Sequence, residues 1–347
     1  MTGGARHAPP LTYRDAGVDI ATKSRLLAGL APAIAATQSD VVAAGIGAFA
    51  GAMQLSAGDA SFLVATVDGV GTKTLLARRL GCDAVIGGDI VAHCANDLVC
   101  QGARPLAFLD YIAMGRLSPS VVETLVRAMT DACGALGVAL LGGETAEMPD
   151  VYAGDAYDVV GTMIGIAPPE GLVTGEAIGP GHRLISLAST GLHTNGYSLA
   201  RRVLERESAV LVHQYIAELG TTVGEALLAP HRCYAPAVLS LFGQLRVRGL
   251  AHITGGGLVD NLTRILPKGC RARIARSWPE PPIFRWLQRI GRISDDEMIA
   301  TFNLGIGMIV VVPARDIEQA LDHFARFEIP AGEIGEVVDG PAGVEFA

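Results

Sequence analysis

The sequence predicts an α/β (α+β) fold built from two mixed α/β domains, and three observations lead to this class. Apolar stretches rich in β-branched residues alternate with stretches of helical periodicity along the chain. The length of 347 residues exceeds what one hydrophobic core usually supports. Pro168 and Pro169 open a turn-rich segment that runs to Gly181, and the alternation restarts after it. We therefore expect one domain over residues 1–170 and another over residues 171–347.

The first half is expected to begin with an extended arm and to continue with four strands and four helices. The expected strands cover residues 61–67, 106–113, 138–142 and 157–167. The expected helices cover residues 21–36, 73–80, 88–101 and 119–134. Ser118 and Pro119 are a typical N-cap and first position for the last of these helices. The glycine-rich segments 45–51 and 142–149 are expected to be loops.

The second half repeats the alternation, which predicts an α/β domain there as well. The expected strands cover residues 183–188, 271–275, 306–312 and 332–338. The expected helices begin after residue 198 and near residues 223–245, 258–266, 281–290, 295–301 and 314–326.

Composition and charge exclude several classes of protein. Half of the residues are hydrophobic and 43 are glycines, which is typical of a tightly packed α/β protein. The net charge of −8 argues against a nucleic-acid partner. No apolar run has membrane-spanning length, and the amino terminus lacks the apolar core of a signal peptide. The six cysteines form no CxxC pair, so we expect reduced thiols in a cytoplasmic protein.

The most informative stretch follows the first predicted strand. That strand ends at Asp68, and the next residues include Gly69, Gly71, Thr72 and Lys73. A carboxylate and an ammonium are thus expected where ligands of α/β proteins usually bind, and they can hold Mg²⁺ and a phosphate. Only three of the 27 basic residues are lysines, which favours a specific role for Lys73. The alternative is a chance lysine on a surface loop.

Acidic residues gather near the predicted strand ends of the first half. The set comprises Asp68, Asp89, Asp97, Asp110, Glu144 and Glu147. In the predicted helix 88–101, Asp89, His93 and Asn96 share one stripe, with Asp97 beside it. We expect this stripe to face Asp68 and to form a site for Mg²⁺ and a triphosphate. The alternative is a solvated polar face on an amphipathic helix.

Two glycine-rich segments are candidate anion sites. Gly45 and Gly47 lie in a segment whose backbone N–H groups can approach a phosphate, although a simple connector would look the same. The second segment comprises Thr254, Gly255, Gly256 and Gly257. It precedes a predicted helix, whose positive amino-terminal end suits a phosphate.

His193 lies in a polar loop between a predicted strand and a predicted helix. A loop histidine can serve as a general acid–base or as a phosphate ligand. It can equally cap the loop, and the residues alone leave both readings open. His252, which precedes the second glycine segment, is the next candidate for acid–base chemistry.

Eight segments together resemble the phosphoribosylformylglycinamidine cyclo-ligase family, also called aminoimidazole ribonucleotide synthetases. They are 13–19, 66–73, 96–99, 108–111, 142–149, 193–198, 252–257 and 302–308. They follow the order of the family and extend over nearly the whole chain. The segments 13–19 and 142–149 are highly specific, whereas 66–73 is shared with relatives that phosphorylate other substrates.

The resemblance implies a homodimer whose core is formed by the amino-terminal, ATP-binding domains. It implies ATP-dependent closure of formylglycinamidine ribonucleotide to 5-aminoimidazole ribonucleotide, with release of ADP and phosphate, in de novo purine biosynthesis. The amide oxygen would be phosphorylated and then displaced by an amidine nitrogen. ATP and Mg²⁺ are the expected cofactors.

Phosphoryl transfer requires positioning and charge neutralisation, and this sets the expected role of each residue. Asp68, Asp89 and Asp97 are expected to hold Mg²⁺. Lys73 is expected to contact the transferred phosphate, and His193 to act as acid–base. The residues expected at the nucleotide are Gly45, Gly47, Gly69, Gly71, Thr72, Asp89, Asn96, Asp110 and Glu144. The residues expected at the substrate's 5′-phosphate are Thr254, Gly255, Gly256 and Gly257.

Two alternatives stay open at the level of the sequence. One is a kinase or synthase of thiamine phosphate or selenophosphate. The selenophosphate enzyme should carry a reactive cysteine near its amino terminus, whereas the first cysteine here is Cys82, and the thiamine phosphate enzyme lacks the segment 142–149. The other is a silent binding subunit, which predicts loss of an acidic set that is retained here.

Overall fold

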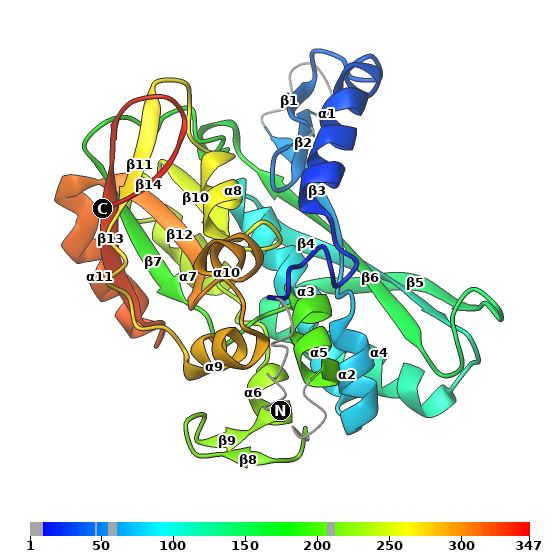
Figure 1. Ribbon diagram of the computed structural model, residues 1–347. Coiled ribbons are helices and arrows are strands. Elements are labelled where there is room, and N and C mark those ends of the chain that lie inside the picture. The colour runs from blue at the N-terminus through cyan, green and yellow to red at the C-terminus, as the bar shows by residue number, and fades with distance from the viewer. Residues whose placement is uncertain (1–9, 46, 55–60, 207–211) are drawn as a thin grey trace, which may run out of the picture.

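The computed structural model describes residues 10–45, 47–54, 61–206 and 212–347 (Figure 1). Each half of the chain builds one six-stranded sheet, and helices pack against both sheets. The strands of the first sheet end at Ala167, and those of the second begin at His182. The mixed α/β class predicted from the sequence is therefore confirmed.

The first sheet has the strand order β1-β2-β3-β6-β4-β5, and all neighbours are antiparallel except β4 and β5. Its strands are β1 (Val42–Ala44), β2 (Gly51–Gln54), β3 (Phe62–Gly69), β4 (Arg104–Met114), β5 (Ala139–Glu147) and β6 (Tyr157–Ala167). Every second residue of β6 is buried, as expected for a strand with one face against a core.

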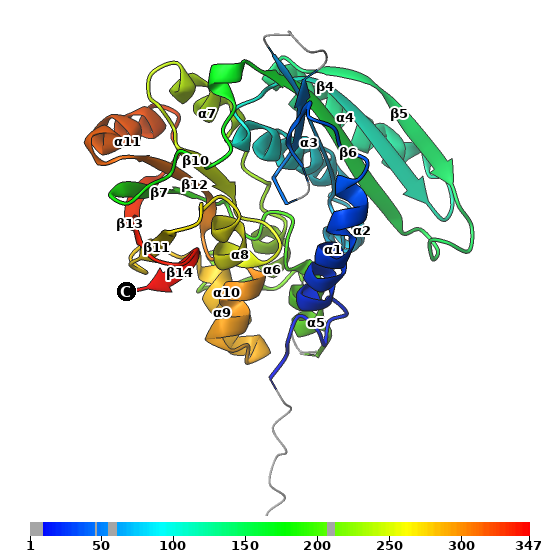
Figure 2. The ribbon, with the colours of Figure 1, turned by 90° about the horizontal axis from the view of Figure 1, so that it is seen from above.

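Helices α3 (Asp83–Cys100) and α4 (Pro119–Leu136) pack together on one face of this sheet, as Figure 2 shows. Helix α4 has Pro119 at its first position and ends at Gly137, whose φ of +66° is the left-handed conformation typical of a helix end. Helix α2 (Lys73–Leu80) connects β3 with α3, and α1 (Ile20–Ala35) lies beside β1, β2 and β3 (Figure 1).

The second sheet has the strand order β10-β12-β7-β13-β11-β14, and only β11 and β14 are parallel. Its strands are β7 (His182–Ala188), β10 (Gly249–His252), β11 (Cys270–Ile274), β12 (Ile306–Pro313), β13 (Ala331–Asp339) and β14 (Gly343–Phe346). The helices of this half are α5 (Tyr197–Arg206), α6 (Val223–Leu227), α7 (Ala235–Phe242), α8 (Gly257–Thr263), α9 (Pro282–Gly291), α10 (Asp295–Thr301) and α11 (Ile317–Arg326). Strands β8 (Tyr215–Ile216) and β9 (Thr221–Thr222) form a separate pair. Within the described residues, no helix has the length and apolarity needed to cross a lipid bilayer.

Helix α3 lies between the two halves. The first sheet contacts one side of it, and α7 and β10 of the second half contact it from the other direction. Its polar residues are therefore buried with the apolar ones, including Asp89, His93, Asn96 and Asp97. The alternative of a solvated polar face is excluded, because this stripe faces the second half of the protein.

One expectation about local structure was wrong, and two short strands were missed. The segment 142–149 is not a loop throughout, because β5 continues to Glu147 by pairing with β4. The described residues between Ala44 and Gly51 form a loop, as expected, but the sequence did not reveal β1 and β2, which border this loop as an antiparallel pair. Strands of three or four residues carry too little periodicity to be recognised in a sequence.

Candidate active site

Two carboxyl groups from different elements meet beside α3. Asp68 lies near the end of β3, and Asp97 lies near the end of α3. Burial, the charge of Asp68 and a hydrogen bond between the two carboxyl groups raise the pKa of Asp97 well above its usual value. His93 lies one helical turn before Asp97, and its Nε2 is 3.5 Å from Asp68 Oδ1 and 4.0 Å from Asp97 Oδ2. These three side chains, which the sequence predicts to face one another, lie together.

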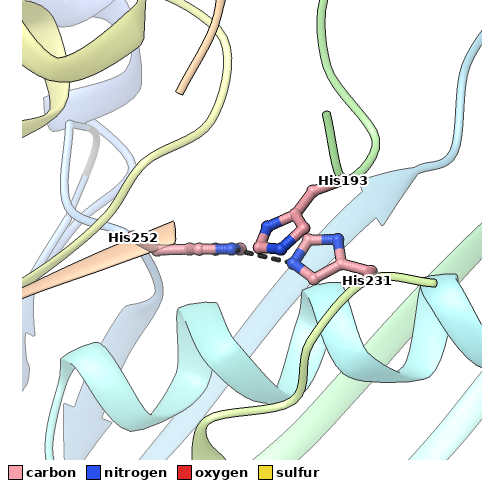
Figure 3. A group of neighbouring side chains, drawn as sticks. All are labelled: His193, His231 and His252. Carbon is pink, nitrogen blue, oxygen red and sulfur yellow. Dashed lines mark hydrogen bonds between the residues drawn. The ribbon is translucent and has the colours of Figure 1, made fainter. Parts of the chain in front are cut away.

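A network of buried histidines continues from Asp97 into the second half, and Figure 3 shows three of them, His193, His231 and His252. His252 Nδ1 lies 2.6 Å from Asp97 Oδ1, and His252 Nε2 lies 3.1 Å from His231 Nε2. His93 Nδ1 lies 2.7 Å from Thr194 Oγ1, which is 3.4 Å from His231 Nδ1. The network thus joins α3 to β10 and to the loops that precede α5 and α7.

Burial lowers the pKa of three histidines of this site, His193, His231 and His252. Burial and the positive charges of neighbouring histidines and Lys73 lower the pKa of His193 and of His231 well below the usual value. Burial also lowers the pKa of His252 to about 3. Because a neutral imidazole donates at one nitrogen and accepts at the other, the rings can take part in proton transfer at neutral pH.

His193 has a backbone conformation that is uncommon outside glycine, with a φ of +60°. Its fully buried ring stacks on His231 at 4.1 Å between ring centroids, with 20° between the planes (Figure 3). The backbone N–H of Thr190 donates to His193 Nε2 at 3.3 Å, so the neutral ring carries its proton on Nδ1. Within the described residues this Nδ1 has no hydrogen-bond partner. His193 therefore has one donor without a partner in the described protein, on a ring that has no exposed surface in this arrangement.

Lys73 and Asp89 form a buried ion pair at 2.5 Å. Lys73 Nζ also donates to the backbone carbonyl groups of His193 and Ala229, at 2.9 and 3.0 Å. The second oxygen of Asp89 accepts a hydrogen bond from the backbone N–H of His231 at 2.8 Å. Lys73 Nζ thus has two hydrogen-bond acceptors and one ion-pair partner, and Asp89 Oδ2 contacts only the ammonium, through the ion pair and without a hydrogen bond. This geometry does not support the predicted roles of Lys73 at a phosphate and of Asp89 at Mg²⁺.

Asn96, which was expected at the nucleotide, also bonds to the backbone of the second half. Its Oδ1 accepts a hydrogen bond from the N–H of Tyr234 at 2.7 Å, and its Nδ2 donates to the carbonyl group of Arg232 at 2.8 Å. The side chain is completely buried. Its amide therefore connects the two halves and is not available to a nucleotide in this arrangement.

The loop before α8 is shaped by packing and by one asparagine. Asn261 Nδ2 donates to three backbone carbonyl groups of this loop. Gly256 and Gly257 have φ values of +95° and +63°, and a Cβ on Gly257 would lie 1.8 Å from a backbone oxygen of α10. In the described part of the chain, the backbone N–H groups of Gly255 and Gly256 make no hydrogen bond. They remain available to an anion, as the sequence predicts for Thr254 to Gly257.

Apart from Asp89 and Asn96 on α3, the predicted nucleotide residues fall in three separate places. Gly45 and Gly47 line a cavity of about 430 Å³ together with Arg264, whose guanidinium lies 5.5 Å from the ring centroid of Phe49. Directly after Asp68, Gly69 is the last residue of β3, and Gly71 and Thr72 lie between β3 and α2.

Asp110 and Glu144 lie apart from the cluster around Asp68. The strand register pairs both Asp68 and Asp110 with Gly161, so β6 separates them. Glu144 is exposed on β5. Within the described residues, no hydrogen bond or ion pair connects Asp110 or Glu144 to Asp68.

Two sets of side chains have the composition of a metal site. In each set the ligand atoms lie within 4.8 Å of one another: His193 with His231 and His252, and His93 with Asp97 and His252. The first set fits an ion poorly, because the stacked rings of His193 and His231 do not direct their lone pairs at one point. Beside the second set, Asp68 adds carboxylate oxygens, which Mg²⁺ prefers. The pair of carboxyl groups therefore fits a hard cation.

Known proteins resemble this chain over nearly its whole length. The phosphoribosylformylglycinamidine cyclo-ligase of Citrifermentans bemidjiense is 44% identical over 338 residues, which cover 96% of this chain and 97% of that protein. The protein of the same name from Geobacillus thermodenitrificans is 44% identical over 337 residues, with 96% and 97% covered. The chain belongs to the phosphoribosylformylglycinamidine cyclo-ligase family. The predicted resemblance is thus confirmed, and the family is one of ligase enzymes in purine biosynthesis.

Both halves of this cyclo-ligase family member match models of protein families. Residues 47–167 match the AIR synthase related protein, N-terminal domain, and residues 179–346 match the corresponding C-terminal domain. A thiamine-monophosphate kinase from Stenotrophomonas maltophilia has the same fold, with a TM-score of 0.62 and 19% identity. The likeness covers 91% of this chain and 95% of the kinase. At this identity it concerns the fold alone.

His231 is the residue at the centre of the site that the sequence did not reveal. It is one of eight histidines and lies outside all segments that carry the resemblance to the cyclo-ligases. Its ring contacts His193 and His252, and its backbone N–H contacts Asp89. No spacing or motif near Pro230 distinguishes it from a core histidine, and only the packing of the two halves identifies it.

Proposed function

We propose that the protein catalyses ATP-dependent closure of formylglycinamidine ribonucleotide to 5-aminoimidazole ribonucleotide, with release of ADP and phosphate. One observation carries this proposal. The carboxyl groups of Asp68 and Asp97 meet beside a network of neutral histidines, in a chain that is 44% identical to a named cyclo-ligase over 96% of its length. The carboxyl pair suits phosphoryl transfer, and the histidines suit the proton transfer of ring closure.

The reaction needs a better leaving group than the amide oxygen. Transfer of the terminal phosphoryl group of ATP to that oxygen leaves ADP and a phosphorylated intermediate. Attack of the amidine nitrogen on the same carbon then forms the carbon–nitrogen bond, breaks the carbon–oxygen bond and releases phosphate. The attacking nitrogen loses a proton, so a nearby base is required.

Asp68 and Asp97 are the residues that we assign to Mg²⁺. Their oxygens lie together, and a cation would relieve the repulsion that raises the pKa of Asp97. Bound there, Mg²⁺ would neutralise charge on the transferred phosphoryl group. Asp89 is left out of this assignment because Lys73 and the N–H of His231 occupy its oxygens.

His193 is the residue that we assign to acid–base chemistry. Its Nδ1–H has no partner in the protein, and its Nε2 can accept a proton once the N–H of Thr190 turns away, whereas His252 is bonded to Asp97 on one side and to His231 on the other. His252 is better suited to orient the carboxyl group of Asp97.

The substrate and the nucleotide need separate anion sites. We assign the 5′-phosphate of the substrate to the free N–H groups of Gly255 and Gly256. Gly69, Gly71 and Thr72 are assigned to ATP because they follow Asp68 directly. Gly45 and Gly47 are assigned to it as well, since their cavity contains the guanidinium of Arg264.

A homodimer is also proposed. Helices α3 and α4 cover one face of the first sheet. Two apolar side chains of this sheet, Val67 on β3 and Leu141 on β5, are 63% and 65% exposed. A second copy of the chain would bury such side chains, which monomeric proteins rarely leave in large patches.

The decisive experiment is an assay of the purified protein with formylglycinamidine ribonucleotide, ATP and Mg²⁺. We expect ADP and the aminoimidazole product in equal amounts. Release of ADP without an imidazole would favour a kinase and would contradict the proposal.

Two substitutions test the assigned carboxylates. Asp68→Asn and Asp97→Asn should each lower kcat by about 1,000-fold or more, because phosphoryl transfer depends on the charge that they position. Circular dichroism should show an intact fold. Asp131→Asn, at an exposed position of α4, is the matched control and should retain normal turnover. Near-normal rates in either active-site variant would remove that residue from the mechanism.

A further inference from the structure

The buried ammonium of Lys73 joins the two halves of the protein through backbone atoms. Lys73 starts helix α2 of the first half, and both carbonyl groups that it binds, those of His193 and Ala229, belong to the second half. These acceptors lie 120 and 156 residues away in the sequence. The exposed fraction of the Lys73 side chain is 0%, so water does not share these hydrogen bonds.

Asp89 completes the connection from helix α3. One oxygen pairs with Lys73, and the other accepts the backbone N–H of His231. The ion pair therefore holds one backbone atom of His193 and one of His231, the two histidines whose rings stack. A shift of either charged group would move the two rings relative to each other.

The backbone of His193 needs such support. Its φ of +60° lies in the left-handed region, which a residue with a Cβ adopts only when its surroundings enforce it. The carbonyl group that Lys73 binds is that of His193 itself. The ring is held separately, by the N–H of Thr190 and by stacking on His231.

We propose that the Lys73–Asp89 ion pair is a positioning device that fixes the strained backbone of His193 and the segment of His231, and that Lys73 does not bind a phosphate of the nucleotide. This inference rests on the proposed function only for its effect on turnover. The geometric part concerns the histidines alone and can be tested whether or not the protein closes the imidazole ring.

Wild-type protein provides the first test. The chain contains only Lys23, Lys73 and Lys268, so selective ¹⁵N labelling of lysine gives few ammonium signals. Exposed ammonium protons exchange rapidly with water, whereas those of Lys73 are protected by burial. We expect one slowly exchanging ammonium signal that stays in place when ATP and Mg²⁺ are added. A missing signal, or one that moves on addition of ATP, would overturn the proposal.

The second test removes the pair. Lys73→Met alone would leave the charge of Asp89 buried without a partner and is prone to misfold. The double variant Lys73→Met/Asp89→Asn has no unpaired charge and is therefore the informative protein. Lys268→Met is the matched control, because it removes an exposed lysine far from the site in sequence.

The double variant should show altered ¹H–¹³C signals of the His193 ring, which are identified by their loss in His193→Gln. Its kcat should fall about 100-fold, as for a misplaced catalytic group, with a KM for ATP within about threefold of wild type. Lys268→Met should match wild type in each measurement. Unchanged His193 signals would overturn the proposal. ATP binding weakened by more than about tenfold with unchanged kcat would overturn it in favour of a phosphate contact.

Discussion

Two buried histidines, His193 and His231, make the stability of this protein depend on pH. Burial lowers the pKa of His193 and of His231 in the folded protein, whereas each has its ordinary value of about 6.5 in the unfolded chain. Above that pH both states are neutral. Below it only the unfolded chain takes up protons, so the free energy of unfolding falls as the pH falls.

Acidification should therefore destabilise the protein through these residues. Each histidine that stays neutral in the folded state should make the free energy of unfolding about 1.4 kcal/mol lower at pH 5.5 than at pH 7.5. We expect His231→Gln to reduce the loss of unfolding free energy between the two pH values by about that amount. Urea unfolding at both pH values measures the difference. An unchanged pH dependence in the variant would mean that His231 titrates normally when folded.

The contact between helices α3 and α4 depends on one glycine. A Cβ at Gly87 would lie 2.5 Å from the carbonyl oxygen of Leu125 and 2.8 Å from the Cβ of Ala128. The neighbouring Gly88 has no such atom within 4 Å. Alanine substitutions at these two adjacent positions therefore distinguish the effect of close helix packing from the intrinsic preference of a helix for alanine.

Alanine at the two positions should have opposite effects. Gly87→Ala should destabilise the protein by about 1–3 kcal/mol, because the helices must move apart. Gly88→Ala should stabilise it by up to about 1 kcal/mol through helix propensity. Thermal unfolding of both variants measures this. A stable Gly87→Ala variant would show that α3 and α4 can separate at little cost.

The exposed apolar side chains of the first sheet bear on the assembly of the whole molecule. The side chains of this sheet include Leu63 and Ala65 under α1, and Val67 beyond α1. On β5, 65% of the surface of Leu141 is exposed, which is close to the 64% of Tyr215 on β8, a strand outside this sheet. Substitutions at these two positions therefore distinguish the loss of a dimer interface from the general effect of removing an exposed apolar side chain.

A charge on the proposed dimer face should separate the subunits. Leu141→Asp should shift the protein from dimer to monomer, because an unpaired carboxylate would be buried in the interface. Tyr215→Asp should leave the dimer intact. Sedimentation equilibrium gives the mass of each variant. A wild-type monomer, or a dimeric Leu141→Asp variant, would contradict the proposed use of this face.

Local patterns in the sequence determine much of the molecule. The strand before Asp68, the one-turn spacing of His93 and Asp97 and the Ser118–Pro119 helix start each depend on neighbours in the chain, and all appear in the structure. The α/β class and the cyclo-ligase family follow from the same patterns. Asp68 lies near the end of a strand, and Asp97 lies near the end of a helix that packs on the same sheet, so their convergence was predictable.

Only the tertiary structure shows what the remaining polar residues contact. The sequence presents Lys73 and Asp89 as ligands of a phosphate and a metal, yet both are buried against backbone atoms of the other half. His231 has no motif, yet it contacts two histidines of the site. A motif records which groups are present. The backbone partners of Lys73 and Asp89 lie more than a hundred residues away, and the packing of the two halves around α3 brings them together.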